Sequence, residues 1–249
     1  MTTSAYTPDE MMTVAAARRL RNGAVCFVGI GLPGAACNLA RMTHAPELVL
    51  IYESGTVGAR PTVLPLSIGD GELAETARSV IPLPEIFTHY LQRGRVDIGF
   101  LGAAQVDRFG NLNSTVIGPY SQPTVRLPGA GGAPEIAAHA REVLIVMKQS
   151  ARTFVEQLDF CTTPARPSAL ITDLGVFEPA ANTRELSLVA VFEGVTADAV
   201  VAACGWPLRV ADRLASVEPP TDEELGLLRD LHARTREAHA ERVRIRLPF

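Results

Sequence analysis

Six short apolar runs, separated by turns and by stretches of helical composition, constrain the fold of this chain most strongly. They cover residues 24–34, 48–53, 96–103, 143–148, 168–177 and 186–192. None alternates strictly between apolar and polar residues, as expected for strands that are covered on both faces. Helical stretches lie between several runs, for example at 35–41 and 134–141. The pattern predicts an α/β fold with an open, largely parallel sheet and helices on both faces.

Capping motifs mark the first and the last helix of this pattern. Thr7, Pro8 and Glu10 supply an N-cap, a proline in the first turn and a capping-box glutamate, which predicts a helix through Arg21. Residues 220–224 repeat this arrangement before a helix with leucines on one side. Residues 241–249 alternate arginine with apolar residues and are interpreted as a basic tail, either solvated or docked on another surface. We predict one domain over residues 1–249.

The composition argues against several classes of protein. The 23 basic and 27 acidic side chains leave a formal charge of −4, which provides no electrostatic footprint for nucleic acid. Asp9 and Glu10 precede any apolar stretch, and glycine and proline interrupt the uncharged run 22–40, so neither a secretory signal nor a membrane span is predicted. The four cysteines form no CxxC pair and have no histidine at ligand spacing, so we expect no metal site. Reduced thiols fit a cytoplasmic protein.

A glycine motif follows the first apolar run. Residues 29–34 read Gly-Ile-Gly-Leu-Pro-Gly, and Glu53 ends the next run nineteen residues beyond Gly34. This is the spacing of a dinucleotide-binding fingerprint, in which Glu53 accepts the ribose hydroxyls. The alternative is a strand-to-helix turn that needs glycine for its backbone angles. A full helix precedes the motif, unlike the usual start of a dinucleotide-binding unit, and this weakens the cofactor interpretation.

Glu53 itself is followed by Ser54 and Gly55, which form a tight turn. A glutamate on a turn at the carboxyl end of a strand faces the crevice where open α/β sheets bind ligands. Glu53 is therefore a candidate reacting group; the alternative is a surface turn with a solvated carboxylate.

A second glycine-rich segment covers residues 127–136, Leu-Pro-Gly-Ala-Gly-Gly-Ala-Pro-Glu-Ile. Small residues ahead of a helix leave backbone N–H groups unobstructed, which suits an anion or a developing oxyanion. A flexible linker is the competing interpretation. The apolar residues close on both sides argue against a linker.

Four segments in order, VGIGLP, YESGTVGA, GAAQVDRFGNLNST and RLPGAGGAPEIA, resemble the β subunit of class I coenzyme A transferases. The resemblance is greatest to the glutaconate CoA-transferase type and extends over most of the chain. The ESG and GAGGAPEIA blocks are far more specific than the first glycine motif alone. One departure is the segment 161–167, which is shorter than in glutaconate-type chains and leaves acyl specificity open.

The resemblance implies a mechanism and a set of site residues. Glu53 would attack the acyl-CoA carbonyl, giving a mixed anhydride and then an enzyme-CoA thioester, and an acceptor carboxylate would reverse the two steps. Coenzyme A is then a substrate, and no metal or tightly bound cofactor is expected. The loop at Gly131, Gly132 and Ala133 would supply the oxyanion site. The implied substrate or CoA pocket contains Gly29, Gly31, Ser54, Gln105 and Asn111, although Asn111 could instead cap the turn at Phe109-Gly110.

The resemblance also implies a partner, a homologous α subunit, in a heterodimer or a multiple of it. We expect transfer of CoA between small carboxylic acids, with dicarboxylic or oxo acids favoured. Three alternatives stay open. They are a hydrolase or decarboxylase of acyl-CoA on the same fold, an NAD(P)-binding Rossmann protein, and a regulatory or scaffold subunit without chemistry.

Overall fold

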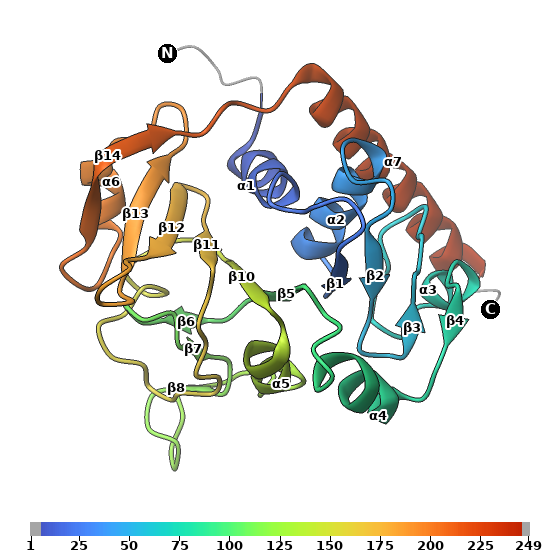
Figure 1. Cartoon of the computed structure of the whole chain (residues 1–249), viewed down its shortest axis with the longest axis horizontal. Coiled ribbons are helices and arrows are strands. Elements are labelled where there is room, and N and C mark those ends of the chain that lie inside the picture. Colours follow the sequence, from blue (N-terminus) through green and yellow to red (C-terminus); the bar gives the residue numbers. More distant parts are fainter. Residues whose placement is uncertain (1–5, 246–249) are drawn as a thin grey trace. The chain divides into compact units, whose positions relative to one another are not determined.

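The computed structural model describes residues 6–245, which form two compact units. Unit 1 comprises residues 6–86 and 220–245, and unit 2 comprises residues 87–219. Figure 1 colours the elements of both units along the chain. The single domain over residues 1–249 that the sequence indicates stays a prediction.

Unit 1 contains four strands in the order β1-β2-β3-β4. β1 and β2 are parallel, and the two hairpin-like pairs β2–β3 and β3–β4 are antiparallel. A π-helical segment, Ile86–Leu91, follows the last helix before unit 2. The elements are α1 Pro8–Ala17, β1 Val25–Phe27, α2 Leu32–Met42, β2 Val49–Ile51, β3 Thr56–Val57, α3 Gly71–Glu75, β4 Ser79–Val80, α4 Leu83–Glu85 and α7 Asp222–Ile245.

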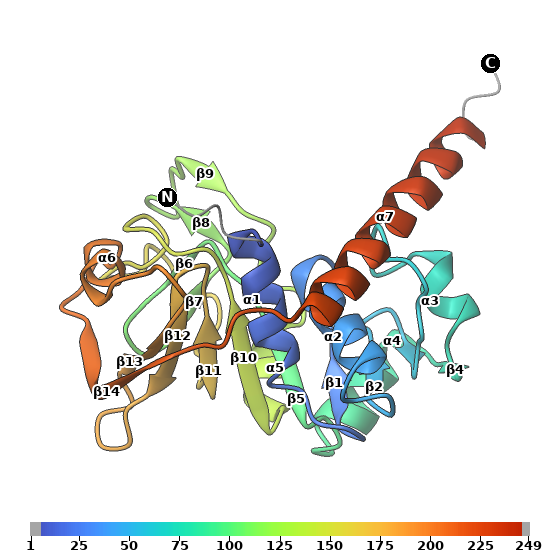
Figure 2. The ribbon, with the colours of Figure 1, turned by 90° about the horizontal axis from the view of Figure 1, so that it is seen from above.

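The helices of unit 1 pack around α2, which contacts both α1 and α7. The α1 helix has the predicted capping box, but it ends at Ala17 because tighter turns follow, with Leu20 N–H donating to Ala17 O at 3.0 Å. Leu225, Leu228 and Leu231 are buried on α7, which confirms the apolar side predicted for the last helix. Figure 2 shows the first half of α7 beside α2. Residues 241–245 of the predicted tail continue α7, and residues 246–249 lie outside the described part.

An ion pair between α1 and α7 predicts a pH dependence of stability. Arg229 Nε and Nη2 donate to the two Glu10 carboxylate oxygens at 2.6 and 3.1 Å. This hydrogen bonding lowers the pKa of Glu10 from 4.5 to about 2. A lowered pKa in the folded state means that the pair stabilises the fold above about pH 4.5, and that the stabilisation is lost as the pH falls to about 2.

We therefore expect the free energy of unfolding of Glu10→Gln to lie below that of the wild type, with the largest difference above about pH 4.5 and little difference near pH 2. Urea unfolding of both proteins across this range measures it. Glutamine keeps the capping-box hydrogen bond to Thr7, so the comparison isolates the ion pair. A difference that does not change with pH would contradict this role.

Unit 2 contains six strands in the order β14-β13-β12-β11-β10-β5 and two separate hairpins. β5, β10 and β11 are mutually parallel where they pair, β11–β12 and β12–β13 are antiparallel, and β13–β14 is parallel. The elements are β5 Ile98–Leu101, β6 Gln105–Val106, β7 Leu112–Asn113, β8 Val116–Ile117, β9 Val125–Arg126, α5 Ala133–His139, β10 Glu142–Val146, β11 Ala169–Ile171, β12 Gly175–Pro179, β13 Leu186–Val191, α6 Ala197–Ala202 and β14 Arg209–Ser216.

The apolar run 168–177, expected to be one strand, is a hairpin of β11 and β12. The Thr172 hydroxyl oxygen accepts the N–H groups of Leu174 and Gly175, both at 3.1 Å, and so closes the turn. Gly175 then pairs so closely with β13 that a Cβ atom there would lie 2.4 Å from Ala190 O. A hydroxyl side chain that stabilises a turn is thus hidden inside an apolar stretch.

The predicted α/β fold class is confirmed in both units. The buried runs do form strands. In unit 2, β5, β10 and β11 are parallel, and β12 pairs antiparallel with β11; in unit 1, β3 pairs antiparallel with β2. No helix between residues 6 and 245 is long and apolar enough to cross a membrane.

Candidate active site

Glu53 lies in a turn whose backbone is fixed by hydrogen bonds on both sides. Gly55 N–H donates to Tyr52 O at 3.0 Å and closes the turn, and Tyr52 N–H donates to Thr56 O at 3.0 Å. Ile81 N–H donates to Gly55 O at 2.9 Å from the neighbouring chain segment. Gly55 has φ +105°, and a Cβ atom there would lie 2.0 Å from Ile81 O. Only glycine satisfies this close approach, so the ESG pattern reflects a backbone requirement.

The side chains of the turn point to different surroundings. Tyr52 is fully buried, and this burial raises the pKa of its phenol, so the ring anchors the turn as a neutral group. Glu53 is partly exposed, and its carboxylate has no hydrogen-bond or ion-pair partner among residues 6–245. The Ser54 and Thr56 hydroxyl oxygens are buried, also without partners in that range. The turn therefore presents one free carboxylate flanked by unused hydroxyl groups.

The first glycine motif lies at the same edge of the unit 1 sheet. Phe27 of β1 is opposite Ile51 of β2 in the parallel pair. Gly29 and Glu53 each lie two residues beyond this pair, so both loops leave the sheet at the carboxyl ends of adjacent strands. Gly31 has φ +75° and begins α2 without a side-chain cap, which accounts for glycine in this turn. The structure thus brings together Gly29, Glu53 and Ser54.

Cys26 and Cys37 lie buried in unit 1, with 3.7 Å between their sulfur atoms and no disulfide. Burial raises the pKa of the Cys37 thiol, so it stays protonated. No group of three or more histidine, cysteine, aspartate or glutamate residues that could hold a metal ion occurs in the described part of the chain.

The second glycine loop, in unit 2, has an open backbone. Gly129 and Gly131 have φ +98° and +50°, with no atom within 4 Å of a Cβ built on either residue. Ala133 N–H donates to Ala130 O at 3.1 Å, so it is already used in a turn. The N–H groups of Gly131 and Gly132 have no acceptor within the described residues. Of the three predicted oxyanion residues, the two glycines therefore offer free donors and Ala133 does not.

Distant residues hold this glycine loop in place. The Ser114 hydroxyl donates to Gly129 O at 2.8 Å, and Gly129 N–H donates to Ser114 O at 2.8 Å. Ser114 N–H in turn donates to the Thr162 hydroxyl at 2.9 Å, which also lies 2.6 Å from the Thr115 hydroxyl. Sequence reasoning missed Ser114, Thr115 and Thr162 as supports. Their small hydroxyl side chains give no pattern, because only the fold brings residues 114 and 162 together.

Removing one of these supports should loosen the loop. We expect Ser114→Ala to cost about 1 kcal/mol of stability, since one hydrogen bond is lost. If the loop serves the CoA transfer that the sequence predicts, its displacement should also lower kcat of that reaction by about tenfold to a hundredfold. Urea unfolding and steady-state kinetics measure the two effects, with Ser121→Ala, at an exposed serine of the same unit, as the control. Equal kcat values for both variants would show that Ser114 does not position the loop.

Gln105 and Asn111, predicted to line the substrate pocket, both have occupied side chains. Gln105 is buried; its Nε2 donates to Asp159 Oδ2 at 2.8 Å and its Oε1 accepts from Asn113 Nδ2 at 2.7 Å. Asn111 Nδ2 donates to Asp107 Oδ2 at 2.8 Å, within the turn that contains Phe109 and Gly110. The Asp107 carboxylate caps this turn by accepting the N–H groups of Phe109 and Asn111, both at 2.9 Å, and the Asn111 amide supports that cap. A direct substrate contact by Gln105 or Asn111 stays a prediction.

Comparison with known proteins places these loops in a family. The sequence pattern described as Coenzyme A transferase matches residues 9–203 of the chain. The chain belongs to the coenzyme A transferase family. It is 58% identical to the β subunit of 3-oxoadipate CoA-transferase from Pseudomonas knackmussii over 96% of this chain and 98% of that protein.

Two solved structures share the fold of this chain. Glutaconate coenzyme A-transferase from Acidaminococcus fermentans gives a TM-score of 0.86 with 29% identity, over 91% of this chain and 94% of that chain. The decarboxylase AibA/AibB gives a TM-score of 0.83 with 31% identity, over 92% and 95% of the two chains. The resemblance drawn from the loops is therefore confirmed, and the chain is the β subunit of a class I CoA-transferase.

The family assignment also decides between the interpretations of residues 29–34. In this CoA-transferase chain the motif is a strand-to-helix turn beside Glu53, and the alternative of an NAD(P)-binding protein is not supported. Coenzyme A is a substrate of the family.

Proposed function

We propose that this β subunit, together with an α-type partner, transfers CoA between small carboxylic acids with Glu53 as the nucleophile. The observation that carries the proposal is the free Glu53 carboxylate on a rigid turn at the carboxyl end of β2. The similarity to the 3-oxoadipate CoA-transferase chain supports an oxo dicarboxylic acid as the acceptor. That relative is one subunit of its enzyme, which supports a second, α-type subunit here.

The proposed reaction divides one exchange into reversible steps. The Glu53 carboxylate adds to the thioester carbonyl and expels CoA thiolate, which leaves a mixed anhydride. The thiolate then attacks the glutamyl carbonyl, releases the donor acid and forms an enzyme-CoA thioester. An acceptor carboxylate reverses both steps. A carboxylate nucleophile suits this exchange because it is ionised at pH 7 and its anhydride is about as activated as the thioester.

Each tetrahedral intermediate carries an oxyanion that needs donors. We assign this role to the N–H groups of Gly131 and Gly132, which have no acceptor in the described residues. One such donor contributes about 10²–10³ in rate. Ala133 is assigned to the turn that orients them, because its N–H is engaged with Ala130 O.

The other residues predicted for the substrate or CoA pocket fall into two groups, one near Glu53 and one whose amide groups are already hydrogen-bonded. Gly29, Gly31 and Ser54 lie at the edge of β1 and β2 near Glu53, so we assign them to the substrate or CoA pocket. Gln105 and Asn111 are assigned supporting roles, since their amide groups already bond to Asp159, Asn113 and Asp107.

The test is to trap the covalent intermediate. The complex with its α-type partner is incubated with succinyl-CoA and reduced with borohydride, which converts a glutamyl thioester to an alcohol. Peptide mass spectrometry should then find the reduction at Glu53. An unmodified Glu53 in a complex that transfers CoA would refute the assignment.

A decarboxylase or hydrolase on the same fold is the alternative function. The similarity to the decarboxylase AibA/AibB favours considering it. The free Glu53 favours transfer. Release of free CoA or CO₂ without any acceptor acid, at a rate equal to that with the acceptor, would favour the alternative.

A further inference from the structure

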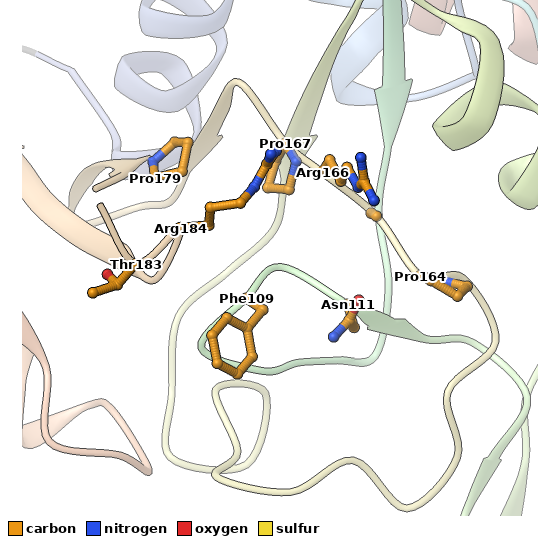
Figure 3. A pocket seen from close by; sticks show the side chains of 9 residues that line it. Phe109, Asn111, Pro164, Arg166, Pro167, Pro179, Thr183 and Arg184 are labelled. Atoms are coloured by element: carbon orange, nitrogen blue, oxygen red, sulfur yellow. The ribbon is translucent and has the colours of Figure 1, made fainter. Parts of the chain in front are cut away.

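A pocket of about 340 Å³ in unit 2 is lined by Asn111, whose amide nitrogen donates to Asp107, and by none of the other residues assigned to the proposed reaction. Its walls come from the Phe109–Asn111 turn, the segment 164–167, the end of β12 at Pro179 and the adjacent loop at Thr183 and Arg184. Figure 3 shows Arg184 extending toward Pro167 and Arg166, with the Phe109 ring across from them. Residues far apart in the sequence thus enclose one space that is large enough for a small organic molecule.

Two guanidinium groups in this pocket lack a carboxylate partner. Neither Arg166 nor Arg184 forms an ion pair or side-chain hydrogen bond within the described part of unit 2. Arg108, by contrast, lies 3.1 Å from Glu156 and 3.9 Å from Glu185. Asp107 is the carboxylate nearest in sequence to the pocket turn, and its oxygens accept three hydrogen bonds from Phe109 and Asn111. Arg166 and Arg184 are exposed, and neither forms an ion pair among the described residues, although Glu185 directly follows Arg184 and lies 3.9 Å from Arg108.

The backbone holds Arg184 in an unfavourable conformation. Its φ of +61° is the one positive φ among the non-glycine residues described. Glycine or asparagine adopts this region at lower cost than arginine, and residues held in such a region are concentrated at ligand sites. An arginine at this position therefore costs stability while it brings a guanidinium to the pocket.

The other walls are apolar. Phe109 is 46% exposed, so much of its ring can contact a molecule in the pocket. Pro164, Pro167 and Pro179 complete the surface. A flat apolar body could lie against these groups while its anionic end reaches the two arginines.

The pocket lies at the amino ends of β10 and β11, and the second glycine loop lies toward the opposite ends of these strands. Ser168 N–H donates to Val143 O at 2.8 Å, so the segment before β11 lies beside the start of β10. Helix α5 ends three residues before β10, and its seven residues carry the glycine loop about 10 Å away from the start of that strand. A ligand in the pocket would therefore not occupy the proposed oxyanion site.

From these observations we propose that the pocket is a second ligand site, which binds a small organic anion with a carboxylate or phosphate group on a flat apolar body. Arg166 and Arg184 bind the anionic group, and Phe109 with the three prolines contacts the body. The site goes beyond the proposed CoA transfer and does not depend on Glu53.

The test is titration calorimetry of the full chain, alone and in complex with its α-type partner, with phenyl phosphate and benzoate as probes. We expect a Kd of about 1 mM or tighter for at least one probe, as is usual for ligands of this size. Benzyl alcohol, which lacks the charge, and inorganic phosphate, which lacks the ring, should bind at least about tenfold more weakly.

Substitutions of the two pocket arginines test whether the probes bind in this pocket. Arg166→Gln and Arg184→Asn should each weaken binding by about tenfold or more. Arg152→Gln, at an exposed arginine of unit 2, should not. Asparagine tolerates positive φ, so Arg184→Asn should have a Tm equal to or above that of the wild type, which separates loss of binding from loss of folding.

Three results of the binding measurements on the variants and probes would overturn the proposal. They are no binding of either probe at about 10 mM, unchanged affinity in both arginine variants, and inorganic phosphate binding as tightly as phenyl phosphate. Binding to the free chain that disappears in the complex would also overturn it, because the arginines would then belong to the interface with the partner.

Discussion

Glu53→Gln is expected to lower the kcat of the complex for CoA transfer by about 10⁴-fold or more, because the amide cannot form the anhydride on which both half-reactions depend. The substitution keeps the size of the side chain. Since the carboxylate makes no hydrogen bond or ion pair within residues 6–245, the Tm should stay unchanged. Steady-state kinetics in both directions and thermal unfolding measure the two effects.

Glu75→Gln is the matched control, at an exposed glutamate of the same unit, and should keep wild-type kcat. A Glu53→Gln complex with more than about one tenth of wild-type kcat would remove Glu53 from the reaction, since loss of a nucleophile is rarely so mild. A variant that loses transfer but keeps acyl-CoA hydrolysis would instead indicate a separate water-activating group.

Gly55→Ala is expected to destabilise unit 1 by about 3 kcal/mol, because two costs add. Alanine at φ +105° is strained, and its Cβ atom would lie 2.0 Å from Ile81 O, where a backbone atom must move. The same movement would displace Glu53, two residues away, so kcat should fall by at least about a hundredfold. Urea unfolding and kinetics of the complex measure these effects.

Gly23→Ala separates the two costs. Gly23 has φ +76° but no atom within 4 Å of a Cβ built there. This variant should lose about 1 kcal/mol, the cost of the left-handed backbone alone, and keep full activity. If both variants lose the same stability, the contact with Ile81 does not constrain the turn.

The catalytic candidates of unit 1 could be predicted because their signals are local. Glycine is the residue that a turn with positive φ requires, so the ESG pattern and the motif at 29–34 are visible without knowledge of any tertiary contact. The same holds for the capping box of α1, which Thr7 and Glu10 form as expected. Asn111, by comparison, has two possible roles in its sequence context, and the structure shows its amide bonded to Asp107, whose carboxylate caps the turn.

Other features needed the fold. The bond between Ser114 and Thr162 joins residues 48 positions apart, and neither belongs to a periodic pattern. The hairpin within residues 168–177 depends on one hydroxyl side chain, Thr172, in an apolar stretch. The free donors at Gly131 and Gly132 differ from Ala133 only through the bond that Ala133 N–H makes to Ala130 O.

The sequence alone determined the α/β class, the nucleophile candidate and the family resemblance, because each rests on residues that are neighbours along the chain. Tertiary structure decided which groups are free to react or bind. It left the Glu53 carboxylate, two glycine N–H groups, and Arg166 and Arg184 without partners in the described residues, while Gln105 and Asn111 were engaged. Whether a polar group has a hydrogen-bond or ion-pair partner depends on which atoms folding brings close to it, and these distances cannot be read from the order of residues in the chain.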